Sequence, residues 1–155
     1  MKIFISSGIG SGPTKLAAFD SALNHAGIAN YNLIKLSSIV PPGTEIYDDY
    51  SESIKGNWGD KLYVVMAEMR VDTPNTEAWA GIGWVQEKET GRGLFVEHEG
   101  NSEQTVIEDI KQSLNALMAT RNVDFGEIKM KVIGKTCKHL PVCALVAAAY
   151  QTQSW

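Results

Sequence analysis

Short apolar stretches alternate with polar, turn-forming segments along the chain, and this pattern predicts two helices among several strands. An apolar run at residues 2–7 predicts a buried strand, and the glycine-rich segment Gly8–Gly12 then leads to Pro13, which suits the first turn of a helix. Apolar residues at helical spacing predict a helix over about residues 13–26 that ends at Gly27. Its predicted buried face consists of Leu16, Phe19, Leu23 and Ala26.

The next apolar segment, at about residues 32–40, predicts a strand that runs through a serine pair into Pro41 and Pro42. Alternation along a strand would place Asn32 and Ser38 on the same face, so we expect them to share an environment. Each proline fixes its own φ and pushes the preceding residue toward extended geometry. We therefore expect the peptide bond between Ser37 and Ser38 to be strained toward reaction.

The remainder of the chain predicts a turn-rich surface loop over residues 43–60, three strands, a helix and two closing strands. Short turns between the three strands, at about 62–71, 77–86 and 93–97, predict an antiparallel meander. The segment Asn101–Gln104 offers the cap of a second helix, with Gln104 at N3 if Asn101 is the cap. This helix is predicted to run to about Thr120 and to bury Val106, Ile107, Ile110, Leu114 and Leu117. The closing strands are expected at about 125–132 and 142–149. Helices segregated on sheets in this order favour a layered α+β domain.

Length, net charge and cysteine content limit the number of domains, the kind of partner and the compartment that we expect. A chain of 155 residues, 44% of them hydrophobic, predicts one domain over residues 1–155. A net charge of −4 argues against a nucleic-acid partner and is compatible with a cationic ligand. The opening apolar run is too short for a signal peptide or a membrane span, so we expect a cytoplasmic protein without membrane association. Cys137 and Cys143 are therefore predicted to be buried free thiols.

Two features suggest ligands without establishing them. The segment Gly8–Gly12 could cradle a phosphate, but it lacks the lysine and serine or threonine that end a P-loop. A strand-to-helix turn, whose glycines allow positive φ and close packing, is the better interpretation. Asp20 lies on the edge of the apolar stripe of the first helix and needs a partner. That partner is either a lysine or arginine of this chain or the guanidinium of a substrate, which a carboxylate can bind bidentately.

A family resemblance covers nearly the whole chain. The chain resembles the pyruvoyl-dependent arginine decarboxylases in several segments: Asp20, Leu23, Ala26-Gly27-Ile28, Asn32-Leu33-Ile34, Ser37-Ser38-Ile39, Pro41-Pro42, Val96-Glu97-His98-Glu99-Gly100 and the stretch from Cys143 to Tyr150. The resemblance implies an α/β/β/α sandwich, with two sheets packed face to face and a helix outside each. It also implies a trimer whose sites lie between neighbouring subunits.

The resemblance also implies a chemistry. Ser38 would attack the carbonyl of Ser37, and elimination and hydrolysis would leave a covalent pyruvoyl group at position 38, splitting the chain into residues 1–37 and 38–155. Glu97 would return a proton to the substrate, and Asn32 would position the reacting groups. Asp20 would bind the basic end of arginine in a pocket lined by Leu23. No metal is implied.

Four alternatives remain open at this stage. A serine hydrolase could use His25, His98 or His139, but no serine lies in a nucleophile-elbow pattern. The spacing of Cys137, His139 and Cys143 matches no familiar zinc signature. An uncleaved, non-catalytic oligomeric relative that only binds a ligand would keep the fold. A pyruvoyl enzyme for another basic amino acid would keep the chemistry as well.

Overall fold

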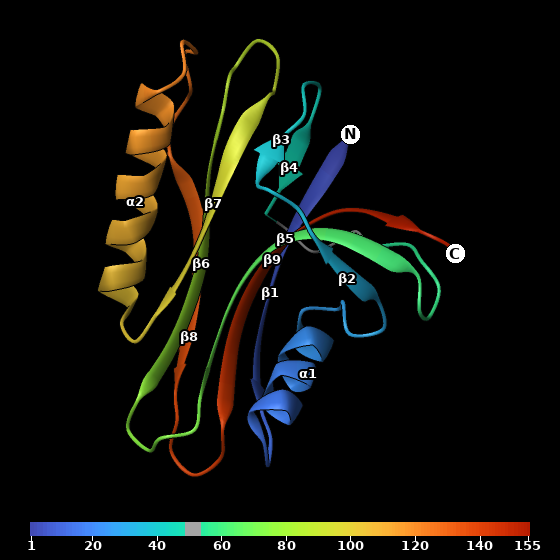
Figure 1. The fold of residues 1–155 in the computed structure, drawn as a ribbon, viewed down its shortest axis with the longest axis vertical. Helices are drawn as coiled ribbons and strands as arrows, with labels where there is room; N and C mark the ends of the chain where they lie inside the picture. The colour runs from blue at the N-terminus through green and yellow to red at the C-terminus, as the bar shows by residue number, and fades with distance from the viewer. Residues whose placement is uncertain (49–53) are drawn as a thin grey trace.

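The structure, a computed structural model, describes residues 1–48 and 54–155 and has four layers (Figure 1). One sheet has the strand order β2-β5-β9-β1-β4, the other has the order β3-β7-β6-β8, and the two sheets pack face to face. Helix α1 covers the first sheet and α2 covers the second. The predicted α/β/β/α sandwich is therefore confirmed. The elements are β1 (Lys2–Ser11), α1 (Lys15–His25), β2 (Asn32–Lys35), β3 (Ile39–Val40), β4 (Glu45–Tyr47), β5 (Lys61–Val71), β6 (Glu77–Gln86), β7 (Gly93–Gly100), α2 (Glu103–Ala119), β8 (Lys129–Thr136) and β9 (Val142–Gln153).

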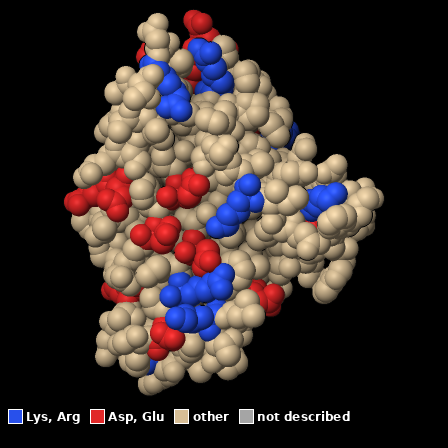
Figure 2. Space-filling view, in the orientation of Figure 1, with Lys and Arg blue, Asp and Glu red and all other residues tan. Residues whose placement is uncertain are grey.

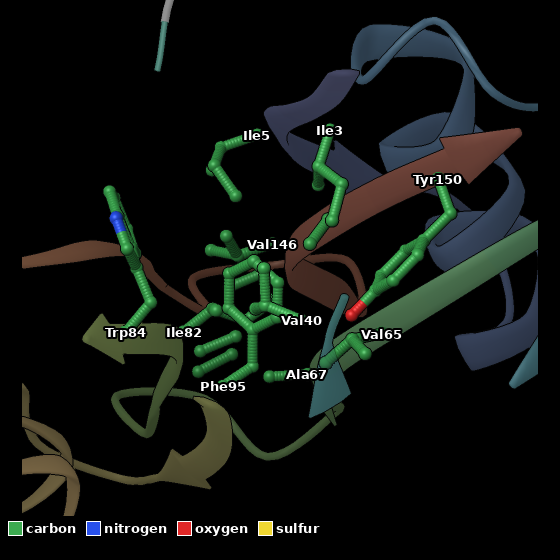
Figure 3. Close-up of a cluster of buried hydrophobic side chains, with 14 of the residues drawn as sticks. Ile3, Ile5, Val40, Val65, Ala67, Ile82, Trp84, Phe95, Val146 and Tyr150 are labelled. Atoms are coloured by element: carbon green, nitrogen blue, oxygen red, sulfur yellow. The ribbon is translucent and has the colours of Figure 1, made fainter. Parts of the chain in front are cut away.

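Three apolar layers hold these elements together, and strand alternation assigns side chains to them. Along β9, Val146 and Ala148 face the other sheet, whereas Leu145 and Ala147 face α1. Because β9 is buried on both faces, its sequence is a continuous apolar run. Figure 3 shows the layer between the sheets, which includes Ile3, Ile5, Val40, Val65, Ala67, Ile82, Trp84, Phe95, Val146 and Tyr150.

Gly8 and Gly10 lie in strand β1, which runs to Ser11, so the predicted turn is wrong for these two glycines, whereas the predicted close approach by a neighbour is confirmed. A Cβ on Gly8 would lie 2.0 Å from the carbonyl oxygen of Ala22, and one on Gly10 would lie 2.2 Å from that of Ala18. The glycines therefore allow α1 to approach β1 closely. This approach requires small residues on the helix, which explains why Ala18 and Ala22 are buried while Leu16, predicted to be buried, is 68% exposed.

The predicted continuous strand over residues 32–40 is also wrong. Its first part, β2, pairs with β5 in the first sheet, and its last part, β3, pairs with β7 in the second sheet. The chain leaves one sheet after Lys35 and joins the other at Ile39. The serine pair therefore lies where the chain crosses between the two sheets.

Other boundaries differ from the predictions for similar reasons. Strand β5 pairs with β9 in the first sheet, while β6 and β7 form a hairpin in the second, so the predicted three-stranded meander is wrong. A short strand, β4, lies in the predicted surface loop and pairs with β1; residues 49–53 of that loop lie outside the described residues. The second helix is capped within the predicted segment, by Ser102, whose Oγ accepts a hydrogen bond from the Thr105 N–H at 3.1 Å.

Both cysteines are buried free thiols, as predicted. Burial, together with the negative charge of Glu68, raises the pKa of the Cys143 thiol to about 12. Such a thiol is protonated at neutral pH and behaves as a small apolar side chain. None of the helices in residues 1–48 and 54–155 combines the length and the apolar character needed to cross a bilayer.

Candidate active site

The link between Ser37 and Ser38 lies between two backbone anchors on different sheets. On its N-terminal side, the Leu36 N–H donates a hydrogen bond to the Val64 carbonyl of β5 at 2.9 Å. On its C-terminal side, the Phe95 N–H of β7 donates to the Ser38 carbonyl at 2.8 Å. The few torsions between these anchors must carry the chain from one sheet to the other.

The backbone of Ser38 takes an unusual conformation at this crossing. Its φ is +63°, in the left-handed region. For a residue with a side chain this conformation costs of order 1–2 kcal/mol. The left-handed φ lies where the chain crosses between the sheets, before β3 and before Pro41 and Pro42. Strain in the Ser37–Ser38 peptide bond itself stays a prediction.

The Ser38 hydroxyl is held by a carboxylate from β7. Its Oγ donates toward Glu97, with Oγ 2.8 Å from Oε2 and 3.0 Å from Oε1. Both side chains are half-buried. A serine Oγ–H hydrogen-bonded to a carboxylate has a proton acceptor in place when the oxygen attacks an electrophile. The structure therefore brings together Ser38 and Glu97, two of the residues that the sequence singled out.

A shallow hollow of about 430 Å³ opens beside this pair. It is lined by Ser38, Phe95, Val96, Glu97, His98, Ser113, Ala116 and Leu117, so both β7 and α2 contribute to it. The Nε2 atom of His98 lies 2.8 Å from the Oγ of Ser113, which holds the imidazole against α2. The mainly apolar wall on the α2 side would exclude water from one side of the serine–carboxylate pair.

Tyr150 belongs to the same region, although our sequence analysis assigned it no role. Its hydroxyl donates to the Ile39 carbonyl at 2.9 Å, and its ring meets the ring of Phe95 edge-on with centroids 6.2 Å apart. Burial, and then the negative charge of Glu97, raise the pKa of the Tyr150 phenol above its ordinary value. One signal was present in the sequence: Tyr150 ends an apolar run, and a buried phenol needs a hydrogen-bond partner.

The predicted substrate-binding residues lie elsewhere on the chain. Asp20 is exposed on α1, where the Asn24 amide donates to its Oδ2 at 3.2 Å, and no lysine or arginine within the described ranges forms an ion pair with it. Leu23 is buried between α1 and the first sheet. Neither residue lines the hollow at Ser38, because α1 packs on β1, β9 and β5.

Asn32 is also separate from the serine pair. Its side-chain amide donates to the Gly59 carbonyl at 2.6 Å. The expectation that Asn32 and Ser38 share one strand face is wrong, because β2 ends at Lys35 and Ser38 lies outside any strand. Within a single chain the predicted site residues thus form two groups: Ser38 and Glu97 at the second sheet, and Asp20, Leu23 and Asn32 at the first.

The surface charge agrees with a cationic ligand. Figure 2 shows acidic side chains across the middle of the face on which β7 and β2 are seen in Figure 1, with Lys and Arg side chains directly beside and below them. Negative potential on a surface raises the local concentration of cations. The net charge of −4 is compatible with a basic small molecule, although this face carries both signs of charge.

Comparisons with known proteins show the family to which the chain is similar. The family model described as pyruvoyl-dependent arginine decarboxylase matches residues 2–154. A protein of that name from Pyrococcus horikoshii is 31% identical over 147 residues, covering 94% of this chain and 92% of the relative. Another from Halobacterium salinarum is 31% identical over 153 residues, with 96% and 93% covered. Archaeoglobus fulgidus has a pyruvoyl-dependent arginine decarboxylase 2 that is 29% identical, with 77% of each chain covered.

Among solved structures, a pyruvoyl-dependent histidine decarboxylase at pH 8 is similar, with a TM-score of 0.48 and 12% identity. The match covers 68% of this chain and 57% of that one. Family membership depends instead on the match over residues 2–154 and on relatives that align along nearly their whole length. The chain therefore belongs to the pyruvoyl-dependent arginine decarboxylase family.

Proposed function

We propose that this protein decarboxylates L-arginine to agmatine and carbon dioxide, using a pyruvoyl group made from its own Ser38. The observation that carries the proposal is the state of Ser38: a left-handed φ of +63° combined with a hydroxyl hydrogen-bonded to Glu97. The names of the relatives supply the cofactor and the substrate. The net charge of −4 is compatible with that substrate, which is cationic.

Maturation would begin with attack of the Ser38 Oγ on the carbonyl carbon of Ser37. The C–N bond breaks, the nitrogen takes up the hydroxyl proton, and an ester replaces the amide. Loss of the Ser38 α-proton then expels the Ser37 carboxylate. One water molecule then hydrolyses the carbon–nitrogen bond that remains at residue 38, which releases ammonia and leaves a ketone. The products are residues 1–37 with a new carboxyl terminus and residues 38–155 with a pyruvoyl group at position 38.

The residues around Ser38 fit such a group. Bound there, it would supply a ketone to condense with the substrate amine and an adjacent carbonyl to take up the electrons released with carbon dioxide. The Phe95 N–H already donates to that carbonyl, the carbonyl of residue 38. Glu97, already in contact with the residue 38 side chain, would return a proton to the substrate α-carbon.

The second group of residues would complete the site from a neighbouring subunit. We propose a trimer in which Asp20 and Leu23 of one protomer, together with its Asn32, face Ser38 and Glu97 of the next. Two facts support this arrangement: the two groups do not meet within one chain, and Asp20 has no cationic partner among the described residues. Asp20 would bind the guanidinium of arginine, which suits a carboxylate. The two free thiols are compatible with a cytoplasmic location, which is part of the proposal.

Intact mass and activity of Ser38→Ala test the maturation scheme. The variant should remain one uncut chain without activity, because it has no nucleophile. Ser37→Ala is the matched control: it changes the neighbouring hydroxyl but keeps the attacked carbonyl, and it should still cut. Wild-type protein should give two fragments, of which the second reacts with a carbonyl-trapping reagent. Wild-type protein that stays whole and releases no carbon dioxide from arginine would identify a non-catalytic binding protein.

Substrate choice is tested separately on cut wild-type protein. Carbon dioxide release should be fastest with arginine, since a guanidinium can form two parallel hydrogen bonds with Asp20, whereas the ammonium groups of lysine and ornithine act as point charges. Faster turnover of lysine or ornithine would assign the protein to another basic amino acid while leaving the pyruvoyl chemistry intact.

A further inference from the structure

The hydroxyl of Tyr150 holds the chain immediately after the proposed cleavage site. It donates to the carbonyl of Ile39, the first residue of β3, while the Phe95 N–H holds the preceding carbonyl, that of Ser38. Two successive carbonyls are thus fixed, one from each sheet, since Tyr150 lies on β9 and Phe95 on β7. Fixing both carbonyls fixes the peptide planes that follow Ser38.

Alternation along β9 places Tyr150 on the same face as Val146 and Ala148. An irregularity in the sheet lies beside it: Tyr63 lies opposite Gln151 and the next residue, Val64, lies opposite Ala149, so the pairing of β5 with β9 skips Tyr150. Such bulges are frequent beside active sites. From β9 the ring of Tyr150 points into the layer between the sheets (Figure 3).

The ring itself is held in place. It is 9% exposed, and its edge contact with Phe95 connects it to the residue whose N–H holds Ser38. A buried ring with few accessible rotamers directs its hydroxyl at one acceptor. The hydrogen bond to Ile39 is therefore part of a rigid arrangement, and its loss would not be compensated by movement of the ring.

The anchors on both sides explain why Ser38 is strained. The Leu36 N–H is hydrogen-bonded to Val64 of the first sheet, and the Ser38 carbonyl is hydrogen-bonded to Phe95 of the second. The chain must therefore cross from one sheet to the other within three residues. Releasing the Ile39 carbonyl would let β3 shift and allow Ser38 to relax to negative φ. A relaxed Ser38 would no longer hold its hydroxyl in one position relative to the Ser37 carbonyl.

We propose that Tyr150 is a positioning residue for self-cleavage, which keeps Ser38 in the conformation from which its hydroxyl attacks Ser37. This inference rests on the proposed maturation. It assigns Tyr150 no contact with the substrate, so its effect should fall on the rate of cutting and not on the turnover of chains already cut.

The test is a time course of cutting for full-length chains made by cell-free synthesis, comparing wild type, Tyr150→Phe and Tyr63→Phe. Tyr63 is the matched control. Together with Ser37 and Tyr150 it lines a hollow separate from the one beside Glu97, but its hydroxyl donates to the side-chain oxygen of Gln153 at 2.6 Å. Tyr150→Phe should cut about tenfold more slowly or worse, as expected when a reacting group loses its alignment. Tyr63→Phe should cut at the wild-type rate.

Two further readouts separate positioning from general damage. Turnover per mole of cut chain should be the same in Tyr150→Phe and wild type, and the two phenylalanine variants should unfold at similar temperatures. Replacing Tyr150 with 4-aminophenylalanine, which keeps a hydrogen-bond donor at the ring tip, should restore most of the cutting rate.

Cutting of Tyr150→Phe at the wild-type rate would overturn the proposal. So would a loss of cutting that 4-aminophenylalanine does not restore, or a Tyr150→Phe chain that fails to fold, because a positioning role requires a fold that persists without the hydroxyl. If wild type itself stays whole, the failure belongs to the proposed maturation and not to the role of Tyr150.

Discussion

At the residue scale, Ser38 combines a strained backbone with a hydroxyl held by a carboxylate. These two features serve different purposes. The left-handed φ raises the energy of the Ser38 backbone, whereas the hydrogen bond to Glu97 orients the oxygen. In the proposed scheme Glu97 would contact the group at position 38 both before and after maturation, so substitutions at Glu97 would separate the two stages.

We expect Glu97→Gln to cut but to turn over arginine at least about 100-fold more slowly, because an amide can still accept the Ser38 hydrogen bond yet cannot deliver a proton. Intact mass measures the first stage and carbon dioxide release the second. Glu99→Gln is the control, because Glu99 is an exposed glutamate two residues further along β7. This variant should cut and turn over arginine as the wild type does. Full activity of Glu97→Gln would exclude it as the acid.

Asp20→Asn should raise the KM for arginine about tenfold or more and leave cutting unchanged, because it removes a charge-assisted contact from the substrate and nothing from Ser38. Steady-state kinetics on cut protein measure the change. Asp72→Asn serves as the control, since Asp72 is an exposed aspartate whose partner is Lys15 at 3.4 Å. An unchanged KM in Asp20→Asn would remove Asp20 from the substrate site.

At the scale of elements, the position of α1 depends on the glycines of β1. Because the helix backbone lies almost against the strand, small residues are required on both sides of the contact. Clustered glycines usually mark turns, which is why the sequence predicted a strand-to-helix turn here. The predicted buried face of the helix is right at Leu23 and Ala26 and wrong at Leu16, which fits an apolar stripe as well as Ala18 and Ala22 do.

Gly10→Ala should destabilise the protein by about 2 kcal/mol or more, because the new methyl group would meet helix backbone that cannot move without undocking α1. The midpoint of denaturant unfolding measures the change. Gly100→Ala is the control, as its methyl group would make ordinary contact with Val106 at 3.5 Å. Equal midpoints for the two variants would show that α1 can shift at little cost.

At the scale of the whole molecule, the proposed site is divided between protomers. At arginine concentrations well below the KM, a protein with only Asp20→Asn and one with only Glu97→Gln should each have weak activity. Co-expressed in equal amounts, they should form mixed trimers in which about a quarter of the interfaces combine an intact Asp20 with an intact Glu97. Activity should therefore rise to about a quarter of the wild-type value.

Carbon dioxide release from the co-purified mixture, compared with a mixture of separately purified variants, measures this complementation. The separately purified mixture is the control, because its trimers form before mixing. Activity that does not rise on co-expression would place both residues in the site of one chain, or would remove one of them from the site.

The sequence by itself determined much about this protein. The order of apolar segments gave a layered α+β domain, and the residues from Asp20 to Pro42, with Glu97, identified the family that the comparisons then confirmed. Local periodicity and local motifs suffice for such conclusions, since they depend on neighbours along the chain.

Only the tertiary structure decided which sheet each strand joins. That choice depends on contacts between residues far apart in the sequence, such as Phe95 with Ser38 and Tyr150 with Ile39. It broke the predicted strand at the serine pair, gave Ser38 its left-handed backbone and moved Asn32 away from it. Alternation of apolar and polar residues continues through residues 32–40 whether the chain stays in one strand or crosses between sheets. No local signal in the sequence could therefore have located that break.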